Sequence, residues 1–251
     1  MAFLTQTAQS LDKDFSVTAI PGLELASIPN WRRDSRGLRR IAVLMLAALS
    51  LLAPVLSYAQ DAAPAKPSPE SELIFEGQGS FGNYKIFAAG EGSHLFTGGV
   101  EYQRHSWGSF LGSRVFYVGE FLPVAILNEP AKLNYYGVPR STNRQYVPGI
   151  GVLPIGFRLL WLDGHAVAPY IMAKGGMFGF TEKVLSPHGS YEDFILHSEI
   201  GVEVRMTDRT NLRLGMGDFH FSNSFIVPSN PGLDVMSYDA GICYRLHRPS
   251  R

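Results

Sequence analysis

From residue 72 onward, apolar and polar positions alternate along most of the chain. Eight segments are rich in aromatic and β-branched residues, and Gly, Pro, Asn or Asp mark the breaks between them. The predicted strands are 73–88, 94–105, 114–127, 149–162, 167–182, 194–206, 211–224 and 235–246. Several of these segments are longer than a typical strand of a soluble protein, which has about five or six residues. They reach the roughly 9–11 residues that a transmembrane strand needs. The pattern therefore predicts an all-β chain.

The predicted connections alternate between short and long over the second half of the chain. Residues 163–165 and 208–210 are tight turns, whereas 128–148, 183–193 and 225–234 are long. This is the pattern of an up-and-down barrel with brief periplasmic turns and longer outer loops. Two connections fit less well: the one around 91–92 is shorter than the pattern requires, and 106–112 is longer. With an even strand number, we predict an eight-stranded antiparallel up-and-down transmembrane β-barrel over residues 72–251.

The segment 211–224 shows the alternation most clearly. One face carries Leu212, Leu214, Met216, Asp218, His220 and Ser222, and the other begins with Asn211 and Arg213. A membrane barrel directs the leucine face toward lipid, whereas a soluble, lipocalin-like barrel would direct it inward. Aromatics near predicted strand ends, such as Trp107 and Trp161, favour the membrane alternative. The residues 247–251 that follow Tyr244 count against it, because outer-membrane strands often finish on a terminal aromatic.

The first part of the chain has the organisation of a targeting segment. Five arginines between residues 32 and 40 precede an uncharged apolar run, 41–56, and Ser57-Tyr58-Ala59 closes it with small residues at both positions that a signal peptidase reads. A membrane anchor is the alternative, but the run is shorter than the roughly 20 residues that span a bilayer. We predict an N-terminal extension and signal peptide over 1–59, cleaved near Ala59, and export to the cell outer membrane. Residues 60–71 form a Pro-rich linker.

Composition narrows the possible partners. The formal charge of the 251 residues is zero, so nothing indicates a nucleic-acid partner. Cys243 is the single cysteine, which excludes an internal disulfide and a Cys-rich metal site, and we expect no metal or cofactor. The sequence makes no prediction of oligomeric state. Glu199, Glu203 and Arg205 alternate along one predicted strand and predict a polar network in the lumen. Further charged residues are candidates to join it: Glu76, Glu101, Arg104 and Glu120.

Candidate chemistry gathers near the C-terminus, in His220-Phe221-Ser222-Asn223 and in the following stretch from Asn230 to Asp234. Residues i and i+2 of a strand share a face, so the imidazole of His220 can take a proton from the hydroxyl of Ser222. The amide of Asn223 is a candidate donor to an oxyanion. Asp234 is the candidate carboxylate that orients the histidine, with Asp218 as a rival. The simpler alternative is that a His-x-Ser pair makes ordinary surface hydrogen bonds.

These residues resemble the C-terminal motif of the lipid A 3-O-deacylase family (PagL-type), which are eight-stranded outer-membrane barrels grouped with acyloxyacyl hydrolase-like proteins. The family pattern is His, any residue, Ser, Asn, then a short loop and an acidic residue. The resemblance implies a serine esterase that hydrolyses an acyl ester of lipid A, with Ser222 as nucleophile, His220 as general base and Asn223 as oxyanion donor. The family glutamate falls on Asp234. Two positions depart from the pattern: Asp stands for Glu, and Ser224-Phe225 stand where members have small residues.

Three functions are compatible with the sequence. The first is an outer-membrane esterase that deacylates lipid A, or a related lipopolysaccharide component, by 3-O-acyl ester hydrolysis through a Ser-His-Asp triad at the lipid-facing outer rim. The second is a non-enzymatic outer-membrane barrel with a structural or adhesion role through the loop 128–148. The third is an exported barrel that binds a lipid.

Overall fold

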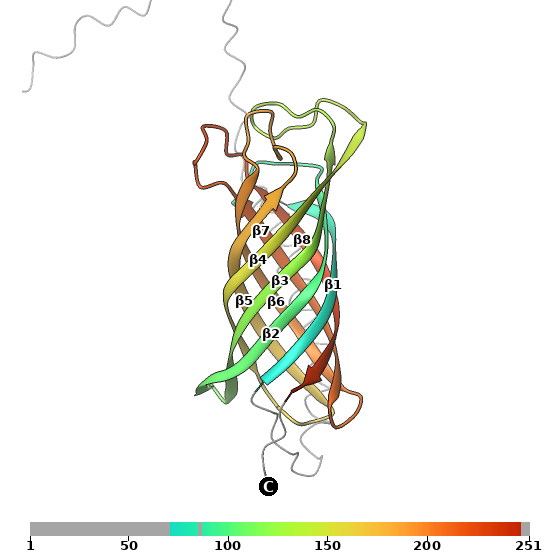
Figure 1. The fold of residues 1–251 in the computed structure, drawn as a ribbon, viewed down its shortest axis with the longest axis vertical. Coiled ribbons are helices and arrows are strands. Elements are labelled where there is room, and N and C mark those ends of the chain that lie inside the picture. The colour runs from blue at the N-terminus through green and yellow to red at the C-terminus, as the bar shows by residue number, and fades with distance from the viewer. Residues whose placement is uncertain (1–70, 85–86, 247–251) are drawn as a thin grey trace, which may run out of the picture. The chain divides into compact units, whose positions relative to one another are not determined.

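The chain folds into a closed barrel of eight antiparallel strands in sequence order, with β1 paired to β8 (Figure 1). The computed structural model describes residues 71–84 and 87–246, and no side-chain detail of 82–84. The strands are β1 (Ser71–Tyr84), β2 (His94–Phe110), β3 (Ser113–Pro130), β4 (Arg144–Leu160), β5 (Val167–Phe180), β6 (Glu192–Arg205), β7 (Thr210–Ser222) and β8 (Leu233–Arg245). The predicted fold class is confirmed.

Short and long connections leave the barrel at opposite ends. The lower end in Figure 1 carries the turns 111–112, 161–166 and 206–209, and the upper end carries 87–93, 131–143, 181–191 and 223–232. The predicted alternation therefore holds over the whole barrel. The prediction of a long connection at 106–112 is wrong, because β2 continues to Phe110 and the turn is two residues. The predicted loop 128–148 is also too long, since β3 and β4 extend into both of its ends.

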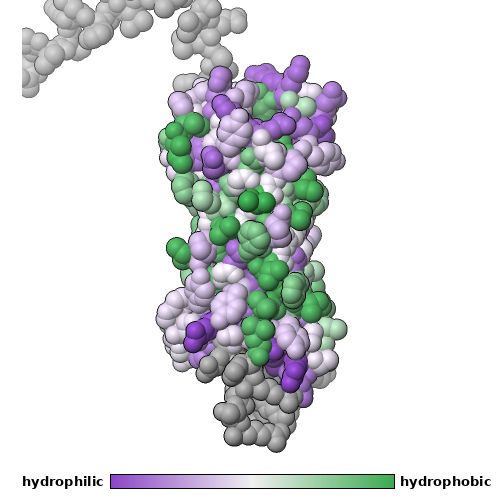
Figure 2. Space-filling model, in the orientation of Figure 1, coloured by the Kyte–Doolittle hydropathy of each residue, from purple (hydrophilic) through white to green (hydrophobic). Residues whose placement is uncertain are grey.

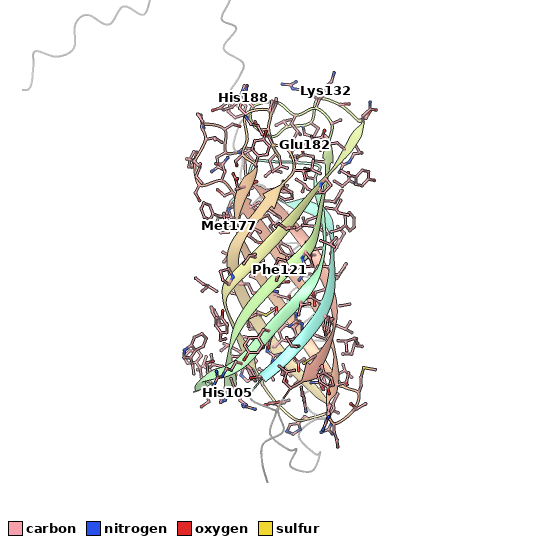
Figure 3. The ribbon with its side chains drawn as sticks, viewed as in Figure 1. His105, Phe121, Lys132, Met177, Glu182 and His188 are labelled. Carbon is pink, nitrogen blue, oxygen red and sulfur yellow. The ribbon has the colours of Figure 1, made fainter. Side chains whose placement is uncertain are left out.

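The barrel is polar inside and apolar outside. In β7 the residues Asn211, Arg213 and Phe219 are buried in the lumen, whereas Leu212 and Leu214 point outward. Figure 2 shows hydrophobic side chains over the middle of the barrel and hydrophilic ones concentrated at its ends. Phe121 and Met177 belong to this middle zone, while Lys132, Glu182 and His188 lie at the upper end and His105 at the lower end (Figure 3). This distribution is that of a transmembrane barrel and excludes the soluble alternative, which requires the leucine face inside.

The lumen is filled by two kinds of packing. Nearer the upper end an apolar cluster surrounds Phe178, Phe219 and Phe221. Below it, three buried cations pair with buried carboxylates. Lys174 Nζ lies 2.7 Å from Glu101 Oε2 and 2.7 Å from Glu120 Oε2, Arg213 donates to Glu76 and Glu101, and Arg158 donates to Glu72 and Glu203. The predicted lumen network is thus present.

Two members of the predicted network are misplaced. Arg104 is exposed, and Arg205 is exposed near the lower turns, where its guanidinium donates to Gly164 O at 2.8 Å. The cations that neutralise the lumen are Arg158, Lys174 and Arg213 instead. Arg104 is three residues from the buried Glu101 on β2, so the period of two places it on the opposite, outward face. Arg205 is the last residue of β6, where water can reach either face.

The predicted N-terminal extension and signal peptide, and nearly all of the linker, lie outside the described residues. Within the residues that are described, no helix is long and apolar enough to cross a membrane.

Candidate active site

His220 and Ser222 lie at the upper end of β7, on its outward face. Their neighbours Phe219, Phe221 and Asn223 are buried, whereas both candidate residues are partly exposed. The alternation of the strand fixes this placement, because a residue two positions further along a strand returns to the same face. The two side chains predicted to work together therefore share one face, at the rim from which the long loops leave.

Asp234 lies directly opposite His220. The structure places it on β8, paired in register with His220, rather than in the connecting loop. His220 Nδ1 lies 2.6 Å from Asp234 Oδ1. Because a carboxylate only accepts, the hydrogen of this bond belongs to Nδ1, and the lone pair of the imidazole is left on Nε2. The shorter aspartate side chain reaches the ring because the residues are direct cross-strand partners.

The carboxylate of Asp234 is held from its other side by the connection between β1 and β2. The backbone N–H groups of Phe87 and Ala88 donate to Asp234 Oδ2 at 2.8 and 3.0 Å. Asp234 is thereby fully buried although it points away from the lumen. The ring of Phe87, itself 75% exposed, packs edge-on against His220 at 5.6 Å between centroids. No sequence pattern indicated these two residues, because backbone donors have no side-chain signature.

Ser222 is hydrogen-bonded to the loop that follows it. Its Oγ donates to Asn230 Oδ1 at 3.2 Å and accepts from Asn230 Nδ2 at 3.0 Å and from Ser224 N at 3.1 Å. Among the described residues these are the hydrogen-bond partners of the hydroxyl, and His220 is not one of them. The structure thus brings His220 and Asp234 into contact and holds Ser222 beside them, with its hydroxyl bonded to an amide.

Asn223 points inward and stabilises the loop. Its Nδ2 donates to Ser229 O at 2.8 Å, and its Oδ1 accepts from Phe225 N at 3.0 Å. The oxyanion role of Asn223 stays a prediction, and in this arrangement its amide N–H is directed to a carbonyl. The side-chain amide bonded to the hydroxyl of Ser222 belongs to Asn230, which the sequence indicates only as part of a turn.

The loop after Ser222 begins with two residues in the left-handed region, Ser224 (φ 50°) and Phe225 (φ 60°). This conformation costs roughly 1–2 kcal/mol for each L-residue other than glycine. Glycine would adopt this conformation without that cost. The bonds from Ser224 N to Ser222 Oγ and from Phe225 N to Asn223 Oδ1 hold the turn.

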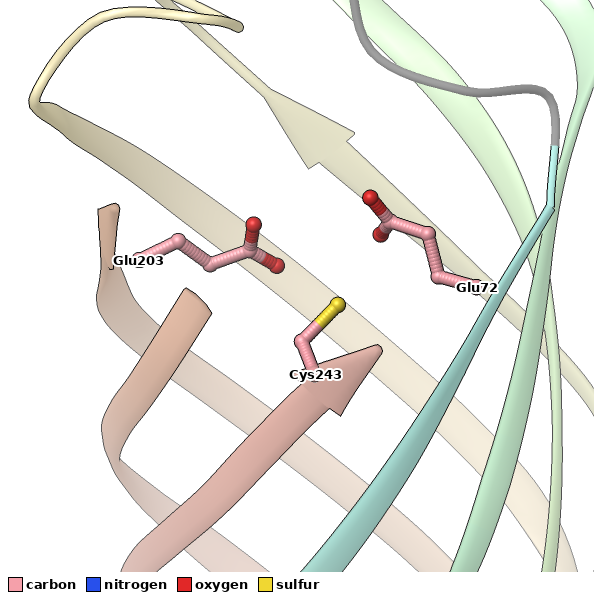
Figure 4. A group of neighbouring side chains, drawn as sticks. All are labelled: Glu72, Glu203 and Cys243. Carbon is pink, nitrogen blue, oxygen red and sulfur yellow. The ribbon is translucent and has the colours of Figure 1, made fainter. Parts of the chain in front are cut away.

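Two groups of side chains elsewhere have the spacing of metal ligands, and both are already neutralised by a cation. Glu72, Glu203 and Cys243 converge in the lower lumen (Figure 4), but Arg158 donates to both of these carboxylates. In the group Glu76, Glu101 and Glu120, the ammonium of Lys174 lies within ion-pair distance of all three carboxylates. A metal ion would have to displace a buried cation at either place, so neither group fits a resident metal.

Comparison with known proteins gives structural neighbours only. No protein-family model matches the sequence, and no curated protein matches it. The outer membrane enzyme PagL superimposes with a TM-score of 0.48 and 15% identity, over 69% of this chain and 99% of that one. The outer membrane protein OprG from Pseudomonas aeruginosa superimposes with a TM-score of 0.40 and 11% identity, over 73% of this chain and 99% of its own.

Proposed function

We propose that this barrel is an outer-membrane serine esterase that removes an acyl chain from lipid A by 3-O-acyl ester hydrolysis. The observation that carries the proposal is the 2.6 Å contact between His220 Nδ1 and Asp234 Oδ1, two residues from Ser222 on the same outward face. A histidine with its tautomer set by a buried carboxylate, beside a hydroxyl, is the arrangement that activates a nucleophile.

In the proposed reaction Ser222 Oγ attacks the ester carbonyl while its proton passes to His220 Nε2. Asp234 keeps the imidazole oriented and stabilises the imidazolium that forms. The imidazolium then protonates the departing sugar oxygen, which leaves an acyl-enzyme, and a water activated by the same histidine releases the fatty acid. The first step requires the Ser222 hydroxyl to leave Asn230 and hydrogen-bond to His220 Nε2. In the structure, Asn230 Nδ2 and Ser224 N both donate to this oxygen.

The surroundings of the site favour a lipid ester as substrate. On the neighbouring strand, Leu196 pairs with His220 and Phe194 pairs with Ser222, and these two outward side chains are 53% and 44% exposed. An acyl chain in the outer leaflet can therefore lie against apolar side chains while its ester reaches the rim. Such a substrate need not leave the membrane, which fits the outward rather than inward direction of the triad.

Mass spectrometry of lipid A tests the proposal. Cells that express the wild-type protein should contain lipid A lacking one acyl chain, and cells that express Ser222→Ala should retain it. Ser198→Ala is a matched control, because Ser198 is an exposed serine on the outer face of β6 outside the site. It should behave as the wild type. Equal acylation of lipid A in the wild-type and Ser222→Ala strains would remove the enzymatic function.

The second candidate is a non-enzymatic outer-membrane barrel. The observation that favours it is the hydroxyl of Ser222, whose bonds go to Asn230 and Ser224 rather than to His220. In this case the same residues only close the loop. Labelling with a fluorophosphonate separates the two candidates, because an activated serine reacts with this probe and an ordinary serine does not. Labelling that is lost in Ser222→Ala supports the esterase, and unlabelled wild-type protein supports the second candidate.

A further inference from the structure

Asn230, whose side-chain amide is hydrogen-bonded to Ser222, is held in place through both of its neighbours in the chain. Ser229 is fully buried, its Oγ donates to Tyr135 O at 2.7 Å, and it lies 2.6 Å from Ser186 Oγ. Since one hydroxyl donates one hydrogen, Ser186 donates to Ser229. On the other side, Pro231 O accepts from Ala89 N at 2.7 Å. Asn230 therefore sits between two residues whose positions are set by other loops.

Two of the hydrogen bonds to this loop come from the opposite side of the barrel. In a closed ring of eight strands, β3 and β4 lie across from β7 and β8. The tip of the connection between β3 and β4 nevertheless crosses the mouth: Tyr135 O accepts from Ser229, and Tyr135 OH donates to Pro228 O at 2.9 Å. The connection itself is a hairpin, with Arg140 N donating to Lys132 O at 2.8 Å, so its tip is carried on a paired stem.

Gly137 completes the contact and is tightly fitted. A Cβ at this position would come 2.8 Å from Pro231 Cβ and 3.0 Å from Leu185 O, and the first of these distances is shorter than such atoms approach in folded proteins. The residue also has a φ of +73°, in the left-handed region. No side chain fits between the hairpin tip and the loop that carries Asn230.

We propose that the hairpin tip 135–137 is a positioning element for the Ser222 site: it fixes Asn230 and, through Asn230, the hydroxyl of Ser222. The proposal rests on the esterase function for its catalytic consequence. The tip acts through the loop 228–231 rather than on the hydroxyl itself. A displacement of about 1 Å at a reacting group costs on the order of 10²-fold in rate, so a small shift of this loop is measurable.

The test compares Gly137→Ala with Gly112→Ala in the full-length protein. Gly112 has a similar φ of +75°, lies in the turn at the lower end, and has nothing within 4 Å of the position that an added methyl group would take. Both substitutions therefore strain the backbone, and only Gly137→Ala pushes on the loop of Asn230. Heat-modifiable electrophoretic mobility confirms that each barrel is folded. The readouts are kcat and KM for lipid A deacylation, the rate of fluorophosphonate labelling of Ser222, and amide hydrogen exchange of residues 223–232.

Gly137→Ala should lower kcat and the labelling rate by about 10- to 100-fold with little change in KM, and should accelerate exchange in 223–232. Gly112→Ala should stay within about 2-fold of the wild type, as expected of a substitution far from the reacting groups. Unchanged exchange in Gly137→Ala, or equal losses in both variants, would overturn the proposal. If Gly137→Ala does not fold, Ser229→Ala replaces it, with Ser190→Ala, another buried loop serine, as its control.

If the proposed esterase function is wrong, the same measurements give a result that differs from failure of the positioning proposal. A wild-type protein that labels at Ser222 and leaves lipid A intact has another substrate, and the labelling rates then test the positioning role. A wild-type protein that shows neither reaction is not an esterase. The exchange data still decide whether the tip holds the loop, because they do not depend on turnover.

Discussion

Among the described residues of the barrel, two histidine–carboxylate pairs lie almost back to back. His220 pairs with Asp234 on the outer face at 2.6 Å, with the histidine side chain 22% exposed. His197 and Glu199 lie in the lumen, 3.7 Å apart and both fully buried, and the ring of His197 stacks on Phe219 at 3.9 Å. In the ladder between β6 and β7, His197 faces Phe219 and the adjacent position places Leu196 beside His220.

The same residue types thus serve different purposes on the two faces of one sheet. The outer pair has its carboxylate fixed by backbone donors and its imidazole open to the rim, beside a hydroxyl. The inner pair is buried against an aromatic ring, so a substrate cannot reach it. Accessibility, more than the presence of a histidine and an acid, separates a candidate site from packing. Three predictions test this difference.

The largest expected effect comes from the outer carboxylate. Asp234→Asn should lower kcat by about 10³- to 10⁴-fold, because an amide can donate to Nδ1 and so move the imidazole hydrogen to Nε2, where the base is needed. The inner counterpart, Glu199→Gln, should leave kcat within about 2-fold of the wild type, since it is remote from the reacting groups. Steady-state assays on the two purified variants measure this. A decrease in kcat of less than about 10-fold in Asp234→Asn would show that the proton transfer does not depend on the His220–Asp234 pair.

A second prediction concerns the charges that hold the inner face together. Arg213 is fully buried and donates to Glu76 and Glu101, the latter at 2.5 Å. Arg213→Ala should lower the free energy of unfolding by about 3–5 kcal/mol, because Glu76 and Glu101 lose one of their two buried counter-ions and are left to share Lys174 with Glu120. Denaturant titration in detergent, followed by electrophoretic mobility, gives this value.

The control for this substitution is Arg104→Ala, which removes an exposed arginine from the outer face and should change stability by less than about 0.5 kcal/mol. Equal denaturant midpoints of unfolding for Arg213→Ala and Arg104→Ala would show that the ion pairs in the lumen do not stabilise the barrel.

The smallest effect is expected at the inner histidine. Both ring nitrogens of His197 are buried without a hydrogen-bond partner among the described residues, although Nε2 lies 3.7 Å from Glu199. His197→Leu should change the free energy of unfolding by less than about 1.5 kcal/mol and leave deacylation unaffected, because an apolar side chain of similar size fills the same space. Loss of activity in a folded His197→Leu barrel would contradict the division between the two faces.

The number of strands, the alternation of their side chains and the end of the barrel at which the candidate site lies were predictable from the sequence. The leucines of 211–224 predict the lipid-facing side, and the period of two then carries His220 and Ser222 onto that side. The failures have two causes. Arg104 was expected in the lumen together with Glu101, although a spacing of three residues places the two on opposite faces of β2. Arg205 was expected in the lumen and Asp234 in a loop, because alternation is a poor guide at the last residue of a strand and where a ladder extends further than its hydrophobic pattern.

The sequence by itself determined that this chain forms eight alternating strands and that a histidine and a serine share one outward face, because both follow from a local period. Only the tertiary structure decided what those residues touch. The register between β7 and β8 set Asp234 opposite His220, the connection after β1 supplied the donors of Phe87 and Ala88, and a hairpin from across the barrel packed against the loop that carries Asn230. These contacts join residues far apart in the chain, and nothing in the local pattern at either end specifies its partner.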